Sequence, residues 1–220
     1  MPRKKTPVDA LTEEGVGQRE PLTRERIELE ALRLIEQDGL DTFSTRRLGA
    51  ALGCEAMSIY NYYPSKAHIL DALVDRVLRA IPTPDRQGSP AERIRELAQH
   101  WRQMARRHAR LYAWLALHRW NSRDGVGFLA EILDCFLAAG LSDEEAARGF
   151  RVLGYYLLGA TLDEINGYAE GTSSLHPLSD EELQRDFPAV ARAGAFFSPE
   201  HFDRTFELGL GVVLEGLKIE

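Results

Sequence analysis

Hydrophobic positions recur with helical spacing along most of the chain. Ile27, Ala31, Leu34 and Ile35 form one apolar face over residues 24–38, which Thr23 is placed to cap and Gly39 to end. The same spacing predicts a helix that begins after Ser65, and others near 91–108, 110–120, 125–139, 143–169 and 199–218. No segment alternates with a period of two over the length of a strand. The pattern therefore predicts an all-α fold.

Breaks in the pattern divide the chain into parts. Residues 1–20 mix charges and prolines without an apolar period, which predicts a disordered arm. The segment PTPDRQGSP at 82–90 holds three prolines and a glycine, so we place one unit at 21–81 and a larger one at 91–220. A polar, poorly patterned insert occupies 170–182.

Residues 44–63 have the spacing of a helix, a tight turn and a second helix. Gly53 stands in the turn, where a left-handed residue is needed, and Gly49 stands where the two helices would cross closely. Apolar positions that would hold the helices near a right angle point inward: Leu48, Leu52, Cys54, Ile59 and Tyr62. The segment is interpreted as a helix-turn-helix.

The outer face of this motif carries side chains that could read DNA. Asn61 can pair with adenine, while Ala56 and Met57 can lie against thymine methyl groups. A recognition helix offers its outward residues to base edges, here Ala56, Met57, Ser58, Tyr60 and Asn61. Groups near two helix starts and the end of the second helix could contact phosphates: Ser44, Thr45, Arg46, Tyr60 and Lys66.

A structural alternative stays open for this segment. Glycine turns between short amphipathic helices occur in many all-α proteins, and Tyr60, Tyr62 and Tyr63 could simply fill a core. The net charge of −7 argues mildly against a DNA-binding protein. Residues 1–80 hold 12 basic and 13 acidic residues, however, so most of the acidity lies in the second part. A nearly neutral N-terminal part can bind phosphates locally but not nucleic acid indiscriminately.

The run GLDTFSTRRLGAALGCEAMSIYNYYPSKAHILDALVDRVL resembles the DNA-binding domain of the tetracycline-repressor (TetR) family. More faintly, GFRVLGYYLLGATLDEINGYAEG and FELGLGVVLEGLK resemble the ligand-binding and dimer-forming helices of its tetracycline-repressor branch. The resemblance implies a three-helix DNA-binding domain, joined by a fourth helix to an all-helical ligand-binding and dimerisation domain. It also implies a homodimer that releases a double-stranded DNA operator when a small molecule binds. Thr45, Met57, Tyr60, Asn61 and Lys66 match the family's DNA-contact positions.

The sequence departs from the family's tetracycline receptors at two positions. Those receptors bind a magnesium–drug chelate through two histidines, and the matching positions here fall near Ile81–Pro82 and Leu115. We therefore expect neither tetracycline as the inducer nor a bound metal, and no cofactor.

Aromatic residues gather in the first helices of the second unit. Large aromatics on adjacent helices can line a small-molecule cavity, although they can equally fill a core. The expected ligand-binding residues are Trp101, Met104, Tyr112, Trp114, Leu115, His118, Phe128, Tyr155, Tyr156 and Asn166. Trp120 belongs to the same aromatic stretch.

Two apolar stripes near the C-terminus could pair two copies as a four-helix bundle. Dimerisation would place two recognition helices about 34 Å apart, in successive major grooves of a palindrome. The alternative is that both stripes belong to an internal core. The expected interface residues are Phe150, Leu153, Leu157, Phe206, Leu210, Val213, Leu214 and Leu217.

The competing function is an all-α small-molecule-binding or enzymatic protein without a DNA-binding role. His100 and His108 lie too far apart on one helix to bind a metal without other ligands, and we find no phosphate loop or nucleophile elbow. Cys54 and Cys135 fall in different units, which disfavours a disulfide. No apolar run reaches the roughly 18 residues of a membrane span, and no apolar leader follows Met1, so we expect a cytoplasmic protein. The absence of catalytic motifs and the resemblance to a regulator family lead us to expect that it is not an enzyme.

Overall fold

The computed structural model describes residues 21–119, 123–167 and 178–220. Expectations for residues 1–20, for Trp120 and for most of the 170–182 insert lie outside these ranges. Every regular element within them is a helix, which confirms the all-α prediction.

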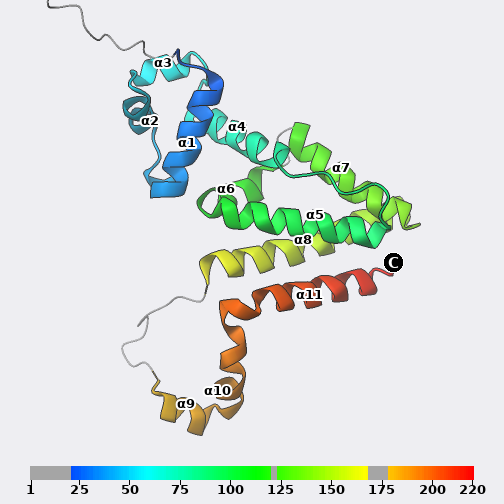
Figure 1. The fold of residues 1–220 in the computed structure, drawn as a ribbon. Coiled ribbons are helices and arrows are strands. Elements are labelled where there is room, and N and C mark those ends of the chain that lie inside the picture. The colour runs from blue at the N-terminus through cyan, green and yellow to red at the C-terminus, as the bar shows by residue number, and fades with distance from the viewer. Residues whose placement is uncertain (1–20, 120–122, 168–177) are drawn as a thin grey trace, which may run out of the picture.

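The N-terminal unit, residues 21–79, contains α1 (Arg24–Asp38), the 3₁₀ turn η1 (Leu40–Thr42), α2 (Thr45–Leu52), α3 (Ala56–Tyr60) and α4 (Lys66–Arg79). Hydroxyl side chains of Thr23, Ser44 and Ser65 accept hydrogen bonds from the first turns of α1, α2 and α4. These caps fix the helix starts where the sequence predicts them. Figure 1 shows α1, α2 and α3 grouped at one end of the molecule, with α4 leading from them to the remaining helices.

The C-terminal unit, residues 90–220, is built around α5 (Pro90–Arg107), α6 (Ala109–His118), α7 (Arg123–Ala138), α8 (Asp143–Asn166) and α11 (Phe202–Gly216). Capping boxes start α5, through Ser89 and Glu92, and α8, through Ser142 and Glu145. α5, α7 and α11 all pack against α8 (Figure 1). The long helix α8 is therefore the centre of this unit.

A helical arm between α8 and α11 departs from the sequence prediction. It comprises α9 (Asp180–Asp186), α10 (Pro188–Gly194), η2 (Ala195–Phe197) and η3 (Pro199–His201), and α9 and α10 extend away from the other helices in Figure 1. The helical pattern in the sequence is too short here to be detected by its apolar period. The capping box Ser179–Glu182 was the signal that could have located α9.

One hydrophobic core runs through both units. It includes Ile27 and Ile35 of α1, Leu73 of α4, and Leu111 and Tyr112 of α6, and it continues to α11. α1 contacts α6 directly, so the two units are in contact through α6 as well as joined by α4. Within the described residues, none of the helices has the length and apolar character needed to span a bilayer.

Candidate nucleic-acid interface and internal pocket

The α2–α3 crossing depends on two glycines. A Cβ atom at Gly49 would lie 2.8 Å from the Cys54 carbonyl oxygen and 3.2 Å from the Ala56 nitrogen. Gly53 ends α2 in the left-handed conformation, with φ of 69°. Both predictions about these glycines are confirmed, and together they let α3 begin directly against α2.

The outer face of α3 is open to solvent. Met57 and Tyr60 have exposed fractions of 69% and 39%, and Asn61 is also exposed. Ala56 and Ser58 are half-buried, while Ile59 is buried on the inner side. Four of the five expected base-facing residues thus belong to one short helix, whose inner face is packed on the core and whose outer face is exposed. Asn61 follows directly after this helix.

Near the start of α2, two of the expected phosphate-contacting groups, Ser44 and Thr45, already have partners of their own. The Ser44 hydroxyl accepts a hydrogen bond from the Arg47 amide at 3.3 Å, and the Thr45 hydroxyl lies 3.1 Å from the Tyr60 hydroxyl. Arg46 is exposed, whereas Arg47 forms an ion pair with Asp38 at 2.6 Å. The Thr45–Tyr60 hydrogen bond ties the first residue of α2 to the last residue of α3 and holds the two together on one surface.

Lys66 has a structural role that sequence reasoning missed. Its ammonium group donates to the Phe43 carbonyl at 2.8 Å and lies 5.5 Å from the centre of the Phe43 ring. A lysine ammonium has three donors. Lys66 can therefore fasten the loop before α2 and still offer a hydrogen to a phosphate.

The tyrosines that follow α3 anchor it to α1. The Tyr62 hydroxyl donates to the Leu22 carbonyl at 2.6 Å, and the Tyr63 hydroxyl donates to Glu28 at 2.5 Å. Burial, together with the Glu28 carboxylate, raises the pKa of Tyr63 to about 12. Of the three tyrosines considered as core residues, Tyr63 is buried, Tyr62 is half-buried and Tyr60 is exposed.

A small apolar pocket with a cavity volume of about 30 Å³ lies among α5, α7 and α8. The rings of Trp101 and Phe128 stack in its wall with centroids 5.3 Å apart and planes 29° apart. Arg119 contributes a cationic group whose pKa is lowered by burial. The remaining wall is aliphatic and aromatic: Ile132, Phe150, Leu153, Gly154, Leu157 and Leu158.

Trp101 and Phe128 are the members of the expected ligand set that line this pocket. Tyr112 and Leu115 are fully buried in the core, and the Tyr112 hydroxyl accepts a hydrogen bond from the Trp101 indole at 3.0 Å and contacts the Thr161 hydroxyl. Burial raises the pKa of Tyr112. Packing in three dimensions, rather than aromatic content, decides which of these rings face the cavity.

The other members of the expected set lie elsewhere. The rings of Trp114 and His118 stack on each other with their centroids 3.8 Å apart, and Tyr155 is exposed. The Tyr156 hydroxyl donates to the Phe206 carbonyl at 2.5 Å, and burial raises its pKa to about 12. Asn166 is exposed, and its amide donates to the Leu162 carbonyl at 2.8 Å.

Met104 lines a second, more polar pocket of about 250 Å³ at the end of α4. Ile81 and Pro82 lie in its wall, as do His100 and His108, and the His100 ring nitrogen Nδ1 is 3.2 Å from the Pro82 carbonyl. Within the described residues, no group of three or more histidine, cysteine or acidic side chains is arranged to hold a metal.

The apolar stripes expected to form a dimer interface lie inside a single chain. Leu153, Leu157, Phe206, Leu210 and Leu214 are buried, and Phe150, Val213 and Leu217 are half-buried against the same core. The expected helix pair does form, since α8 packs against α11, but these residues face inward. The opposite, exposed face of the pair carries other apolar side chains: Val152, Tyr155, Leu208 and Val212.

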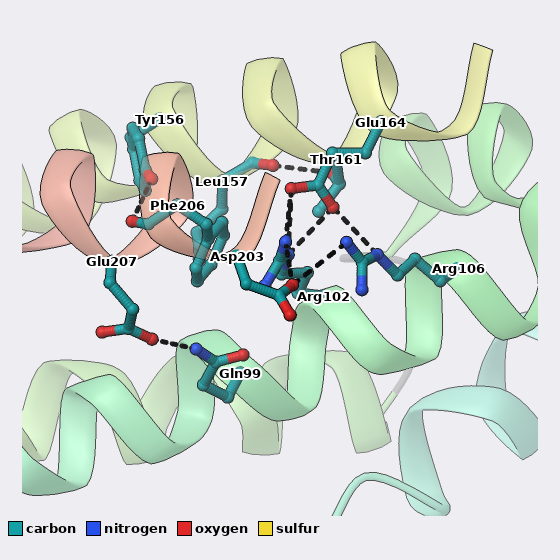
Figure 2. A network of polar contacts seen from close by, with 10 residues as sticks. All are labelled: Gln99, Arg102, Arg106, Tyr156, Leu157, Thr161, Glu164, Asp203, Phe206 and Glu207. Carbon is teal, nitrogen blue, oxygen red and sulfur yellow. Dashed lines mark hydrogen bonds and ion pairs between the residues drawn. The ribbon is translucent and has the colours of Figure 1, made fainter. Parts of the chain in front are cut away.

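A network of charged side chains fastens the start of α11 to α5 and α8 (Figure 2). Arg102, which is buried, forms an ion pair with Glu164 at 2.7 Å and one with Asp203 at 2.9 Å. Arg106 binds the same Glu164 at 3.0 Å. Burial opposes the charge on Arg102, but the two carboxylates raise its pKa, so it remains cationic.

Comparisons with known proteins agree with this arrangement. The model for "Bacterial regulatory proteins, tetR family" matches residues 29–73, and the model for "Tetracyclin repressor-like, C-terminal domain" matches residues 82–220. The repressor DrrR1 of Streptomyces coeruleorubidus is 29% identical, over 92% of this chain and 80% of its own. The class A tetracycline repressor of transposon 1721 from Escherichia coli is 28% identical, over 85% and 86%.

Solved structures show the same fold. ActR from Streptomyces coelicolor without ligand superposes with a TM-score of 0.70 at 28% identity, and covers 90% of this chain and 97% of its own. The complex of ActR with actinorhodin has a TM-score of 0.68 with the same coverage. The helices described above are thus arranged as in a ligand-binding regulator.

Proposed function

Because this chain belongs to the TetR family of bacterial regulatory proteins, we propose that it binds a palindromic operator as a homodimer and releases it when a small molecule enters the C-terminal unit. The observation that carries the proposal is the exposed face of α3, which is held against α2 by Gly49 and presents Met57, Tyr60 and Asn61 together. An outward helix with an adenine-reading amide suits the major groove.

Selection of bound fragments from genomic DNA would identify the operator. In binding measurements with that fragment, Asn61→Ala should weaken affinity by about 1–3 kcal/mol and relax the preference at one base pair of each half-site. Asn166→Ala is the matched control, because Asn166 is an exposed asparagine at the end of α8, outside the N-terminal unit. Equal affinities of the wild type and Asn61→Ala for every sequence would contradict the proposed docking.

Phosphate contacts are expected from the exposed side of α2 and from Lys66. Arg46→Ala should weaken binding to all sequences alike and reduce the salt dependence of affinity. Lys66→Ala should do the same and also destabilise the loop before α2, since its ammonium group holds the Phe43 carbonyl. A change in base preference caused by Arg46→Ala would count against its assignment to a phosphate.

We place the dimer surface on the exposed face of α8 and α11, where Val152, Tyr155, Leu208 and Val212 lie. Leu208 and Val212 have exposed fractions of 69% and 62% in the single chain. Large apolar side chains on one face favour burial against a partner. Val212→Asp should therefore leave the chain folded but make it monomeric by light scattering at micromolar concentration. Leu117→Asp is the control, because Leu117 is an exposed leucine of α6.

We propose that the pocket among α5, α7 and α8, whose cavity of about 30 Å³ must widen to hold a ligand, takes a flat aromatic molecule with an acidic group. The stacked rings of Trp101 and Phe128 form an aromatic wall, and Arg119 supplies the cation. Actinorhodin and fused-ring aromatic carboxylates are suitable probes, with Trp101 fluorescence as the readout. A Cβ atom at Gly154 meets nothing within 4 Å, so Gly154→Leu should fill the pocket and abolish binding, whereas Gly127→Leu on α7 should not. Unchanged affinity of Gly154→Leu for every probe that binds the wild type would place the ligand elsewhere.

The relatives are transcriptional regulators, and we propose that this chain has no enzymatic activity of its own. A protein that acts on the chromosome works in the cytoplasm, where we place it. If the chain binds no genomic fragment above background, the alternative of a small-molecule-binding protein without a DNA role gains support.

A further inference from the structure

The end of α1 meets the beginning of α6 through one carboxylate. Glu36 lies in the last turn of α1, and its Oε2 accepts a hydrogen bond from the Arg110 backbone amide at 3.3 Å. Its other oxygen, Oε1, is 3.7 Å from Nδ1 of His108. Glu36 Oε1 and His108 Nδ1 are both buried, and neither has a hydrogen-bond partner among the described residues.

α6 begins without a cap from its own chain segment. His108 occupies the N-cap position and makes no side-chain capping bond to the helix. The free amides at a helix start favour a negative charge, since they carry the positive end of the helix dipole. Glu36 therefore supplies to α6 the cap that its own sequence lacks, and it does so from the N-terminal unit.

The charged residues near Glu36 are bonded to other partners and do not compete for its carboxylate. On α1, Arg33 is bonded to Glu30 and Gln37, and Asp38 is paired with Arg47. On the α6 side, Arg110 places its guanidinium against Gly39, where a Cβ atom would be 3.4 Å away. His108, which lies beside Glu36, and Arg107 of α5 both line the second pocket.

From this geometry we infer that Glu36 is a positioning residue that couples the N-terminal unit to α6, a route separate from the covalent connection through α4. This inference rests on the proposed function. A shift of α6 that breaks the Glu36–Arg110 bond leaves a half-buried carboxylate and a helix start without partners, so the two units favour moving together. Coupling of this kind is reciprocal. If a shift of α6 changes the free energy of operator binding, then operator binding changes the free energy of that shift by the same amount.

Hydrogen–deuterium exchange of the full chain, with and without the selected operator fragment, tests the coupling without knowledge of the inducer. In the wild type, the operator should slow exchange in α3 and change exchange at the start of α6 by about fivefold or more. In Glu36→Ala, protection of α3 should persist, while the response of α6 should disappear. Glu36→Gln keeps the shape and an acceptor for the Arg110 amide, and should restore part of the response.

Glu30→Ala is the matched control, because Glu30 lies on the same helix and bonds Arg33 within α1. It should leave the α6 response intact. An α6 response in Glu36→Ala equal to that of the wild type would overturn the coupling role while leaving the proposed function standing. Absence of protection in α3 of the wild type would instead overturn the proposed function, and this inference with it.

Discussion

Gly49 lies in close contact with the start of α3, and this contact can be tested by adding a single methyl group. In Gly49→Ala the new Cβ would lie 2.8 Å from the Cys54 carbonyl oxygen and 3.2 Å from the Ala56 nitrogen. Both neighbours are backbone atoms, so α3 must move away from α2 to relieve the contact. We expect the substitution to destabilise the N-terminal unit and to weaken operator binding.

The size of the effect follows from two opposing contributions. Overpacking lowers the free energy of unfolding by about 1–3 kcal/mol. Replacing a glycine inside a helix by alanine raises it by about 1 kcal/mol. Gly127→Ala isolates the second contribution, because Gly127 is helical and exposed and a Cβ there meets nothing within 4 Å. The free energies of unfolding of the two variants should therefore differ by about 1–3 kcal/mol, with Gly49→Ala the less stable.

Urea unfolding monitored by far-ultraviolet circular dichroism measures this difference. Tryptophan fluorescence adds a location, because Trp101, Trp114 and Trp120 all belong to the C-terminal unit. Loss of helical signal before loss of the tryptophan signal in Gly49→Ala would place the damage in the N-terminal unit. If Gly49→Ala instead gains as much stability as Gly127→Ala, the crossing of α2 and α3 is looser than the structure indicates and the reasoning fails.

Two further predictions concern buried polar groups. Arg102→Met should lower the free energy of unfolding in urea by about 3 kcal/mol, because Glu164 is left buried with one of its two arginines. Arg106→Met, at the more exposed position, should lower it distinctly less. Equal losses in the two variants would contradict the burial argument. Tyr63→Phe should cost about 1 kcal/mol near pH 7, through loss of the bond to Glu28. Because the folded-state pKa of Tyr63 is raised to about 12, its contribution is complete below the unfolded pKa of about 10 and is lost as the pH rises toward 12. The difference between wild type and Tyr63→Phe should therefore shrink across that range, and a constant difference would refute the assignment.

Local signals in the sequence were sufficient to locate the helix-turn-helix. A capping hydroxyl at Ser44 and a left-handed glycine at Gly53 are fixed by backbone geometry within a few residues, so the structure reproduces them. The same holds for α1, whose bounds match the expected 24–38. Short elements with little apolar periodicity were not predicted from the sequence, and for α9 only the Ser179 capping box was informative.

The pocket could not be derived in the same way, because a cavity depends on where several helices fail to fill space. Tyr112 and Trp101 are neighbouring aromatics bonded to each other, yet one is core and the other also lines the cavity. Lys66 shows the same limit for polar groups. Its bond to the Phe43 carbonyl spans 23 residues and leaves no trace in sequence spacing.

The burial of the expected dimer stripe within a single chain has a physical reason and a mechanistic consequence. A helical period shows that Leu153 and Leu157 are buried, but not which neighbour covers them, and here they line the internal pocket instead of a partner surface. On the opposite side of the same helix, Val152 and Tyr155 are exposed. α8 thus separates the pocket from the proposed partner surface by the width of one helix. Because packed interiors transmit displacement, a ligand that pushes on Leu153 must move the face that carries Tyr155. A change in spacing between two recognition helices can then begin at α8, in addition to any movement of α4.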